Sequence, residues 1–160
     1  MKSHSLALLL PLVLLTQCGE KQTAGTREKP ETLVEAFDES EMDAAIAKAR
    51  ATVDEFIEVL AERDADQFSI KAPITDSNGT EHFWITNISY ENGTFSGKIA
   101  NDPGIVEKVQ FGDSWTVTED GISDWMYVRG EKIHGGYTID PLLDSYSEEE
   151  AQKMREKLVR

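Results

Sequence analysis

The sequence predicts an α+β domain, a twisted antiparallel β-meander packed against one long N-terminal helix and followed by a short C-terminal helix. Apolar residues recur every three or four positions between Ser40 and Arg63, which is typical of an amphipathic helix. From Gln67 onward the chain changes to short β-branched and aromatic runs separated by turn signals. Short strands with frequent turns indicate an antiparallel sheet, and a second helical signal closes the chain.

Residues 1–18 predict a signal peptide with a lipobox-like end. Lys2 precedes the apolar run Leu6–Leu15, which is shorter than the roughly 20 residues of a transmembrane helix. Cys18, the only cysteine, follows at the place of the lipidated residue in bacterial lipoprotein signals, although Gln17 stands where those signals usually carry a small residue. The alternative is cleavage by an ordinary signal peptidase near Ala24.

We therefore expect an exported protein, anchored as a lipoprotein in the bacterial envelope, at the outer membrane if the cell has two membranes. The alternative is a soluble periplasmic or secreted protein. Residues 19–39 are polar and predict a flexible tether, which at this length spans about 25 Å. Residues 40–160 then form a single α+β domain.

The helix expected over Ser40–Arg63 begins with a capping-box pattern, in which Ser40 is followed by Asp43. Its apolar stripe is expected to pack on the sheet, and no Gly or Pro interrupts it. Near the C-terminus, Ser147 and Glu150 form a second capping-box pattern, and basic residues close the segment.

Strands are expected wherever β-branched and aromatic residues cluster between turn signals. Asn78-Gly79 and Asn92-Gly93 predict type I′ hairpins, because both central residues of that turn need a positive φ. The later expected strands are Val106–Phe111, Ser114–Thr118, Ile122–Val128 and Lys132–Thr138.

The charge of the chain limits its partners. It carries 16 Lys and Arg against 30 Asp and Glu, a formal net charge of −14. Nucleic-acid binding depends on basic residues that neutralise phosphates, so we expect no nucleic-acid partner. The expected partners are a membrane, through the lipid anchor, and an unknown protein or small ligand. The sequence shows no pattern that calls for a cofactor.

Six short motifs follow one another in the strand region: Phe68-x-Ile-Lys71, Glu81-His82-x-Trp84, Phe95-x-Gly97-x-Ile99, Asn101-x-Pro103, Ile122-x-Asp124-Trp125-Met126 and Gly135-Gly136-Tyr137-Thr138. In this order they resemble the DUF2314 family, over roughly residues 62–144. Relatives tend to carry a basic residue two positions after the Thr, where this chain has Asp140, so an anionic-ligand role of that residue does not carry over. The family implies no established activity.

The residues with acid–base potential are Glu81, His82 and Asp124. Neighbouring residues of a strand point to opposite faces, so Glu81 and His82 do not form a ready-made pair. The catalytic interpretation makes them general acids or bases. The structural interpretation has Glu81 and His82 fix a turn and a strand edge, and has Asp124 tie down a turn beside Trp125.

Candidate ligand-binding residues gather in the β part: Trp84, Trp125, His134, Gly135, Gly136 and Tyr137. Aromatic side chains can line a groove, but core packing explains most of them. The paired glycines predict a bend or the close approach of another backbone, and exposed Gly amides can bind an anion. His82, His134 and Asp124 lack the spacing of a metal motif, so no metal site is predicted.

The function that the sequence favours is a non-enzymatic binding or interaction module held at a membrane. Whether it is an enzyme stays open, with a negative answer preferred. One alternative is an envelope hydrolase that uses Glu81, His82 and Asp124. A second alternative is an immunity or stress-related interaction protein.

Overall fold

The computed structural model describes residues 37–159. The predicted signal peptide, Cys18 and nearly all of the predicted tether therefore lie outside the described residues. Within the described part of the chain, no helix combines the length and the apolar composition needed to cross a membrane.

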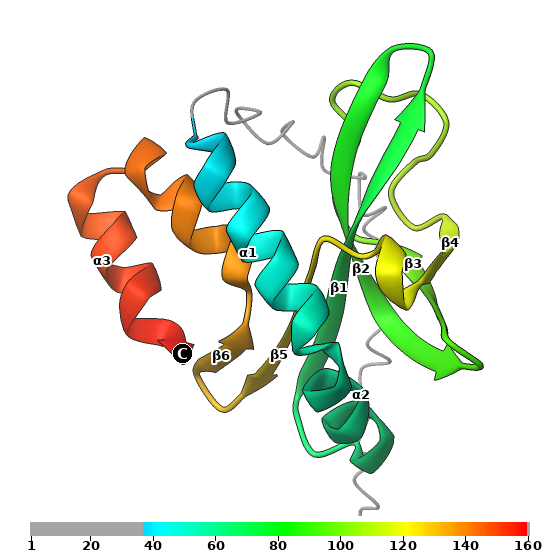
Figure 1. The fold of residues 1–160 in the computed structure, drawn as a ribbon, viewed down its shortest axis with the longest axis horizontal. Helices are drawn as coiled ribbons and strands as arrows, with labels where there is room; N and C mark the ends of the chain where they lie inside the picture. Colours follow the sequence, from blue (N-terminus) through cyan, green and yellow to red (C-terminus); the bar gives the residue numbers. More distant parts are fainter. Residues whose placement is uncertain (1–36, 160) are drawn as a thin grey trace, which may run out of the picture.

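The amphipathic segment forms two helices rather than the single long helix expected from its apolar stripe. Helix α1 covers Glu39–Ala51 and helix α2 covers Val53–Glu62. Thr52 separates them with φ −116°, far from helical values. Figure 1 shows the two helices lying across one face of the sheet, with a change of direction between them.

Competition for one carbonyl explains the break. The indole Nε1–H of Trp125, on a distant strand, donates to the backbone oxygen of Ala49 over 2.8 Å. Both the amide and the hydroxyl of Thr52 also donate to Lys48 O and Ala49 O. Lys48 O thus keeps its ordinary helical bond from the Thr52 amide, whereas Ala49 O is bound by the Trp125 indole and by Thr52, so α2 starts anew at Val53.

The start of α1 also differs from the expected capping box. The N-cap is Asp38, whose Oδ1 accepts hydrogen bonds from the amides of Ser40 and Glu41 at 2.8 and 3.1 Å. An Asp at this position satisfies amides that the helix leaves without partners. Asp38 therefore takes the role predicted for Ser40.

Seven strands form one sheet in the order β4-β3-β2-β1-β5-β6-β7, antiparallel except for the β6–β7 pair. Their bounds are Gln67–Asp76 for β1, Gly79–Glu91 for β2, Thr94–Ile99 for β3, Ser114–Thr118 for β4, Asp124–Arg129 for β5, Lys132–Gly135 for β6 and Leu158–Val159 for β7.

The sheet is not a simple meander. Strands β1 to β4 follow one another outward, but after the 3-10 turn η1 (Glu119–Gly121) the chain returns to pair β5 with the free edge of β1. The amide of Ser123 donates to Lys71 O over 2.7 Å, just ahead of this pairing. The long hairpin β1–β2 thus forms the centre of the sheet.

The two predicted hairpin turns differ. Asn92 and Gly93 have φ of 51° and 76°, as a type I′ turn requires. In the first hairpin Gly79 already pairs with Asp76, so the loop consists of Ser77 and Asn78. The amide of Asn78 donates to Asp76 Oδ1 over 2.8 Å, which closes this turn through a side chain.

The expected strand at Val106–Phe111 is absent, and residues 100–113 form a loop. Side chains of the β1–β2 hairpin hold this loop: Asp76 Oδ2 accepts from the amides of Glu107 and Lys108 at 2.7 and 3.1 Å. Figure 1 shows the loop beside the end of the hairpin. Carboxylates therefore satisfy amides that a strand would have placed in a ladder.

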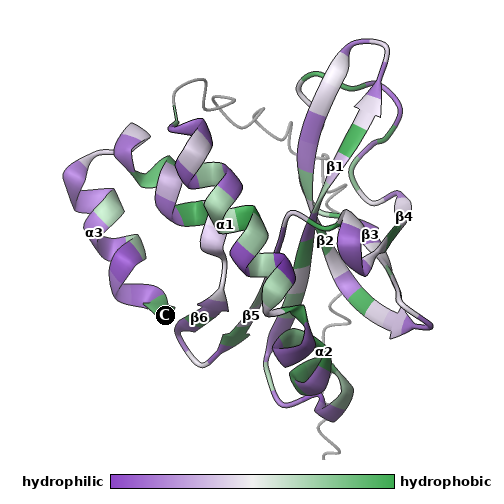
Figure 2. Cartoon of the chain, viewed as in Figure 1, coloured by the Kyte–Doolittle hydropathy of each residue, from purple (hydrophilic) through white to green (hydrophobic). Residues whose placement is uncertain are grey.

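The C-terminal part confirms the expected short helix. Strand β6 is shorter than expected and leads into the 3-10 segment η2 (Tyr137–Ser145), which packs beside α1. Helix α3 (Glu148–Lys157) begins with the predicted capping box of Ser147 and Glu150. Figure 2 shows α3 as largely hydrophilic, in keeping with Ala151 as its only buried residue.

The core lies between the sheet and the two N-terminal helices. Phe56 of α2 is fully buried, and its ring lies within 5.6–5.9 Å of the rings of Trp125, Phe68 and Phe95. Such edge and tilted ring contacts add to the area that the side chains bury. Phe56 therefore joins α2 to strands on both sides of β1.

Trp125→Phe should lower the free energy of unfolding by about 1–3 kcal/mol, because it removes the indole N–H that binds Ala49 O while keeping an aromatic ring in the core. Chemical denaturation monitored by circular dichroism measures this loss.

The matched control is Trp115→Phe, since Trp115 is only partly buried on the edge strand β4. It should cost clearly less. Equal losses in the two variants would contradict a special role for the indole bond.

Candidate functional site

Three motif residues lie side by side in the middle of the sheet. Lys71 of β1 is paired with Trp84 of β2 on one side and with Asp124 of β5 on the other. Directly paired residues of antiparallel strands point to the same face. Their face is opposite to the one on which Ile70 and Ala72 enter the core. Register alone thus brings together residues from three separate motifs.

Asp124 is fully buried and is saturated with hydrogen-bond donors. Its Oδ1 accepts from the amides of Trp125 at 2.8 Å and Tyr137 at 3.1 Å. Its Oδ2 accepts from the amide of Thr138 at 2.8 Å and from the Thr138 hydroxyl at 2.7 Å. Burial raises the pKa of the Asp124 carboxyl, while these hydrogen bonds and the nearby Lys71 oppose the rise.

Lys71 completes this network. Its Nζ donates to Thr138 Oγ1 over 3.2 Å and lies 5.5 Å from the centre of the Trp84 ring. Burial lowers the pKa of the Lys71 ammonium, and the charge of Asp124 acts in the opposite direction. The Thr138 hydroxyl that links the two residues is itself buried, so it is closed to a substrate.

His82 lies on the same face of β2 as Trp84, two residues before it in the strand. Its Nδ1 is 2.8 Å from the hydroxyl oxygen of Ser123, the residue before Asp124. His82 keeps an exposed surface, yet partial burial of the ring lowers its pKa, and the charges of Lys71 and Arg50 lower it further. Arg50 reaches this region from α1, with its Nε donating to Ile122 O over 2.7 Å.

Glu81 lies on the other face of β2, apart from His82, as the alternation of the strand predicts. The side chain is buried, and its carboxylate accepts from the amides of Gly104, Ile105 and Val106 at 2.9–3.4 Å. Successive backbone amides form a pocket for an anion, which Glu81 fills from within the chain. Glu81 anchors the 100–113 loop.

The remaining aromatic candidates stack along β5 and β6. The ring centres of Trp125 and Tyr127 are 6.1 Å apart in a stacked arrangement, and His134 also stacks on Tyr127 at 4.6 Å. Tyr137 meets Trp125 edge-on at 5.6 Å. Burial and then the charge of Arg129 lower the pKa of His134. This stack is separate from Lys71 and Trp84, and it belongs to the helix-covered face through Trp125.

The paired glycines form a close backbone approach. Gly135 and Gly136 have φ of 75° and 66°, and a Cβ on Gly135 would lie 2.3 Å from Trp125 O. The amide of Gly136 donates to that same oxygen over 2.8 Å. The bend ends β6 and directs the following amides of Tyr137 and Thr138 toward Asp124.

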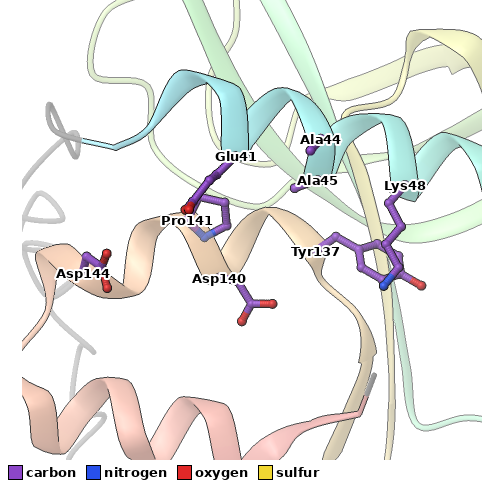
Figure 3. A pocket seen from close by; sticks show the side chains of 8 residues that line it. All are labelled: Glu41, Ala44, Ala45, Lys48, Tyr137, Asp140, Pro141 and Asp144. Atoms are coloured by element: carbon purple, nitrogen blue, oxygen red, sulfur yellow. The ribbon is translucent and has the colours of Figure 1, made fainter.

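A hollow of about 380 Å³ lies between α1 and η2. Figure 3 shows Lys48 of α1 above the ring of Tyr137, with Asp140 on the η2 side. The Lys48 Nζ is 4.8 Å from the centre of this ring. Of the predicted ligand-binding residues, Tyr137 alone lines this hollow.

The structure therefore brings His82, Trp84 and Asp124 to one face and leaves Glu81 and His134 elsewhere. His82, His134 and Asp124 form no shared metal site, and within residues 37–159 no group of three His, Cys, Asp or Glu could hold a metal ion. Three further residues take part that were not singled out as candidates: Lys71, Ser123 and Arg50. Lys71 and Thr138 were quoted in the motifs but not named as candidates. For Lys71 the reason is that a Lys among alternating strand residues has no local signal of burial.

Asp124→Asn should lower the free energy of unfolding by about 2–4 kcal/mol. Whichever oxygen the amide nitrogen replaces, two of the four donors lose their acceptor. Urea unfolding curves with an unchanged slope measure the loss.

Asp120→Asn is the matched control, because Asp120 is exposed and its Oδ1 accepts a side-chain bond from Thr118. It should change stability little. A loss at Asp124 no larger than this control would refute the structural role of Asp124.

Comparisons with known proteins agree with the motifs. The family described as "Uncharacterized protein conserved in bacteria (DUF2314)" matches residues 39–158, which includes both N-terminal helices as well as residues 62–144. The chain is 53% identical over 154 residues to "Uncharacterized protein YegJ" of Escherichia coli K12, covering 96% of this chain and 97% of that protein.

A putative ankyrin repeat protein of Neisseria meningitidis serogroup B is 37% identical over 75 residues, 47% of this chain and 30% of that protein. No solved structure matches the chain. The family match over most of the domain and the near full-length relative show that this chain belongs to the DUF2314 family.

Proposed function

We propose that the protein is an exported, lipid-anchored component of the bacterial envelope whose folded domain is a binding module for a protein or a small ligand. In this proposal Cys18 carries the lipid and the segment before the domain spaces it from the membrane. The domain binds its ligand through the surface around Trp84 and His82.

We prefer a binding function to hydrolysis because of the hydrogen bonds that the two motif carboxylates, Glu81 and Asp124, accept. Glu81 is held by three loop amides, and Asp124 by three amides and one hydroxyl. They lie on opposite faces of the sheet. A general acid or base must reach the proton that it transfers. These carboxylates instead hold the backbone in place.

Three observations support the rest of the proposal. The pattern of residues 1–18 fits a lipoprotein signal, and a net charge of −14 favours solubility. A relative over 75 residues is named as a putative ankyrin repeat protein. Repeats of that class present extended binding surfaces, so this name supports a role in interaction.

Cys18→Ser should abolish incorporation of labelled fatty acid and release the protein from the membrane fraction, because the lipid is attached to the Cys18 thiol. Labelling in cells and fractionation of membranes by ultracentrifugation measure both effects.

Gln17→Ala is the matched control. It places a small residue before Cys18, so labelling and membrane retention should equal or exceed those of the natural chain. Unchanged fractionation of Cys18→Ser would overturn the anchored form of the proposal.

A further inference from the structure

Two basic side chains meet at the segment Ile122–Ser123, and a third, Lys71, lies close enough for its charge to act on one of them. Arg50 donates to Ile122 O over 2.7 Å, and His82 Nδ1 lies 2.8 Å from Ser123 Oγ. The ammonium of Lys71 lies at Thr138 and Trp84 on the same face, and its charge acts on His82. One helix and two strands thus each contribute a basic group to a single small area.

Neutral oxygens position these three basic side chains. Arg50 binds a carbonyl, His82 binds a hydroxyl, and Lys71 Nζ binds the hydroxyl of Thr138. Within residues 37–159, the ion pairs closer than 4.0 Å use three other cations, Arg129, Lys153 and Arg155. The positive charges of the cluster are therefore held in place without a direct carboxylate partner among the described residues.

Such a cluster is unexpected in a chain of net charge −14. Like charges close together repel each other, and the lowered pKa of His82 reflects burial together with repulsion from Lys71 and Arg50. The carboxylates that act on the cluster are Asp124, which is enclosed by its own donors behind Lys71, and Asp120, which faces Arg50. Neither lies within ion-pair distance of the three cations.

We propose that Arg50, Lys71 and His82 form, with the hydroxyl of Ser123, a binding site for the oxyanion group of a ligand. The oxyanion is a carboxylate or a phosphate-type group. This inference deepens the proposed binding function and rests on it. Asp140 lines the hollow beside α1, and none of these four residues lines that hollow.

The three cations supply complementary chemistry. The guanidinium of Arg50 offers a planar set of N–H donors that suits two oxygens of one anion. The ammonium of Lys71 is a point charge beside Trp84, and its other N–H donors remain beyond the one bonded to Thr138. Protonated His82 adds a third charge, so anion binding and His82 protonation should favour each other.

The test follows histidine ring signals by NMR in the full chain, labelled with ¹³C-histidine and kept in a non-ionic detergent. The chain has three histidines, His4, His82 and His134, and single His→Gln variants assign them. Titrations are recorded in sodium sulfate, in sodium acetate, and in sodium chloride at equal ionic strength.

The pKa of His82 should be higher in sulfate or acetate than in chloride. The rise should correspond to an about three-fold or greater preference of the anion for the protein with a protonated His82 ring. The pKa of His134, which faces Arg129 on another part of the sheet, should stay unchanged. A response to sulfate indicates a phosphate-type ligand, and a response to acetate alone indicates a carboxylate.

Arg50→Gln should remove most of the anion-induced rise at His82, whereas Lys98→Gln, on the exposed part of β3, should leave it intact. No rise with either anion, an equal rise at His134, or a full rise in Arg50→Gln would overturn the site. Membrane fractionation does not depend on these anions, so the site and the lipid anchor can fail separately.

Discussion

The buried carboxylate of Asp124 is the interaction on which the other features of the domain depend. A carboxylate in this position is costly unless donors surround it. The Gly135–Gly136 bend supplies those donors by turning the amides of Tyr137 and Thr138 toward it. The same bend places Thr138 against Lys71 and starts η2 beside α1. The Asp124 carboxylate thus fixes the position of η2 relative to the centre of the sheet.

On the opposite face, the carboxylate of Glu81 plays the same part, because it accepts hydrogen bonds from the amides of the loop that follows β3. Donors within the domain thus occupy both motif carboxylates, Glu81 and Asp124. The charged groups left near the surface around Lys71 are therefore basic, and two of them, Arg50 and His82, contact the segment Ile122–Ser123. This division explains how a strongly acidic chain can present a local site of positive charge.

Local patterns predicted the features that local forces determine. The apolar stripe, the Asn92–Gly93 turn and the Ser147 capping box depend on neighbours in sequence, and all are present. The break at Thr52 depends on an indole from a distant strand, and the pairing of β5 with β1 has no local signal. The partnership of Lys71 with Asp124 follows only from that pairing, so sequence reasoning could name the motif without finding the site.

Native-state hydrogen exchange of the Tyr137 and Thr138 amides tests the central role of Asp124 most directly. If the buried carboxylate joins η2 to the sheet, both amides should exchange only through global unfolding, with the protection of core strand amides such as Ile70. The amide of Gly130, which donates to the carboxylate of Asp66 at an exposed turn, should exchange through local opening. Exchange of Tyr137 and Thr138 as fast as that of Gly130 would contradict the account.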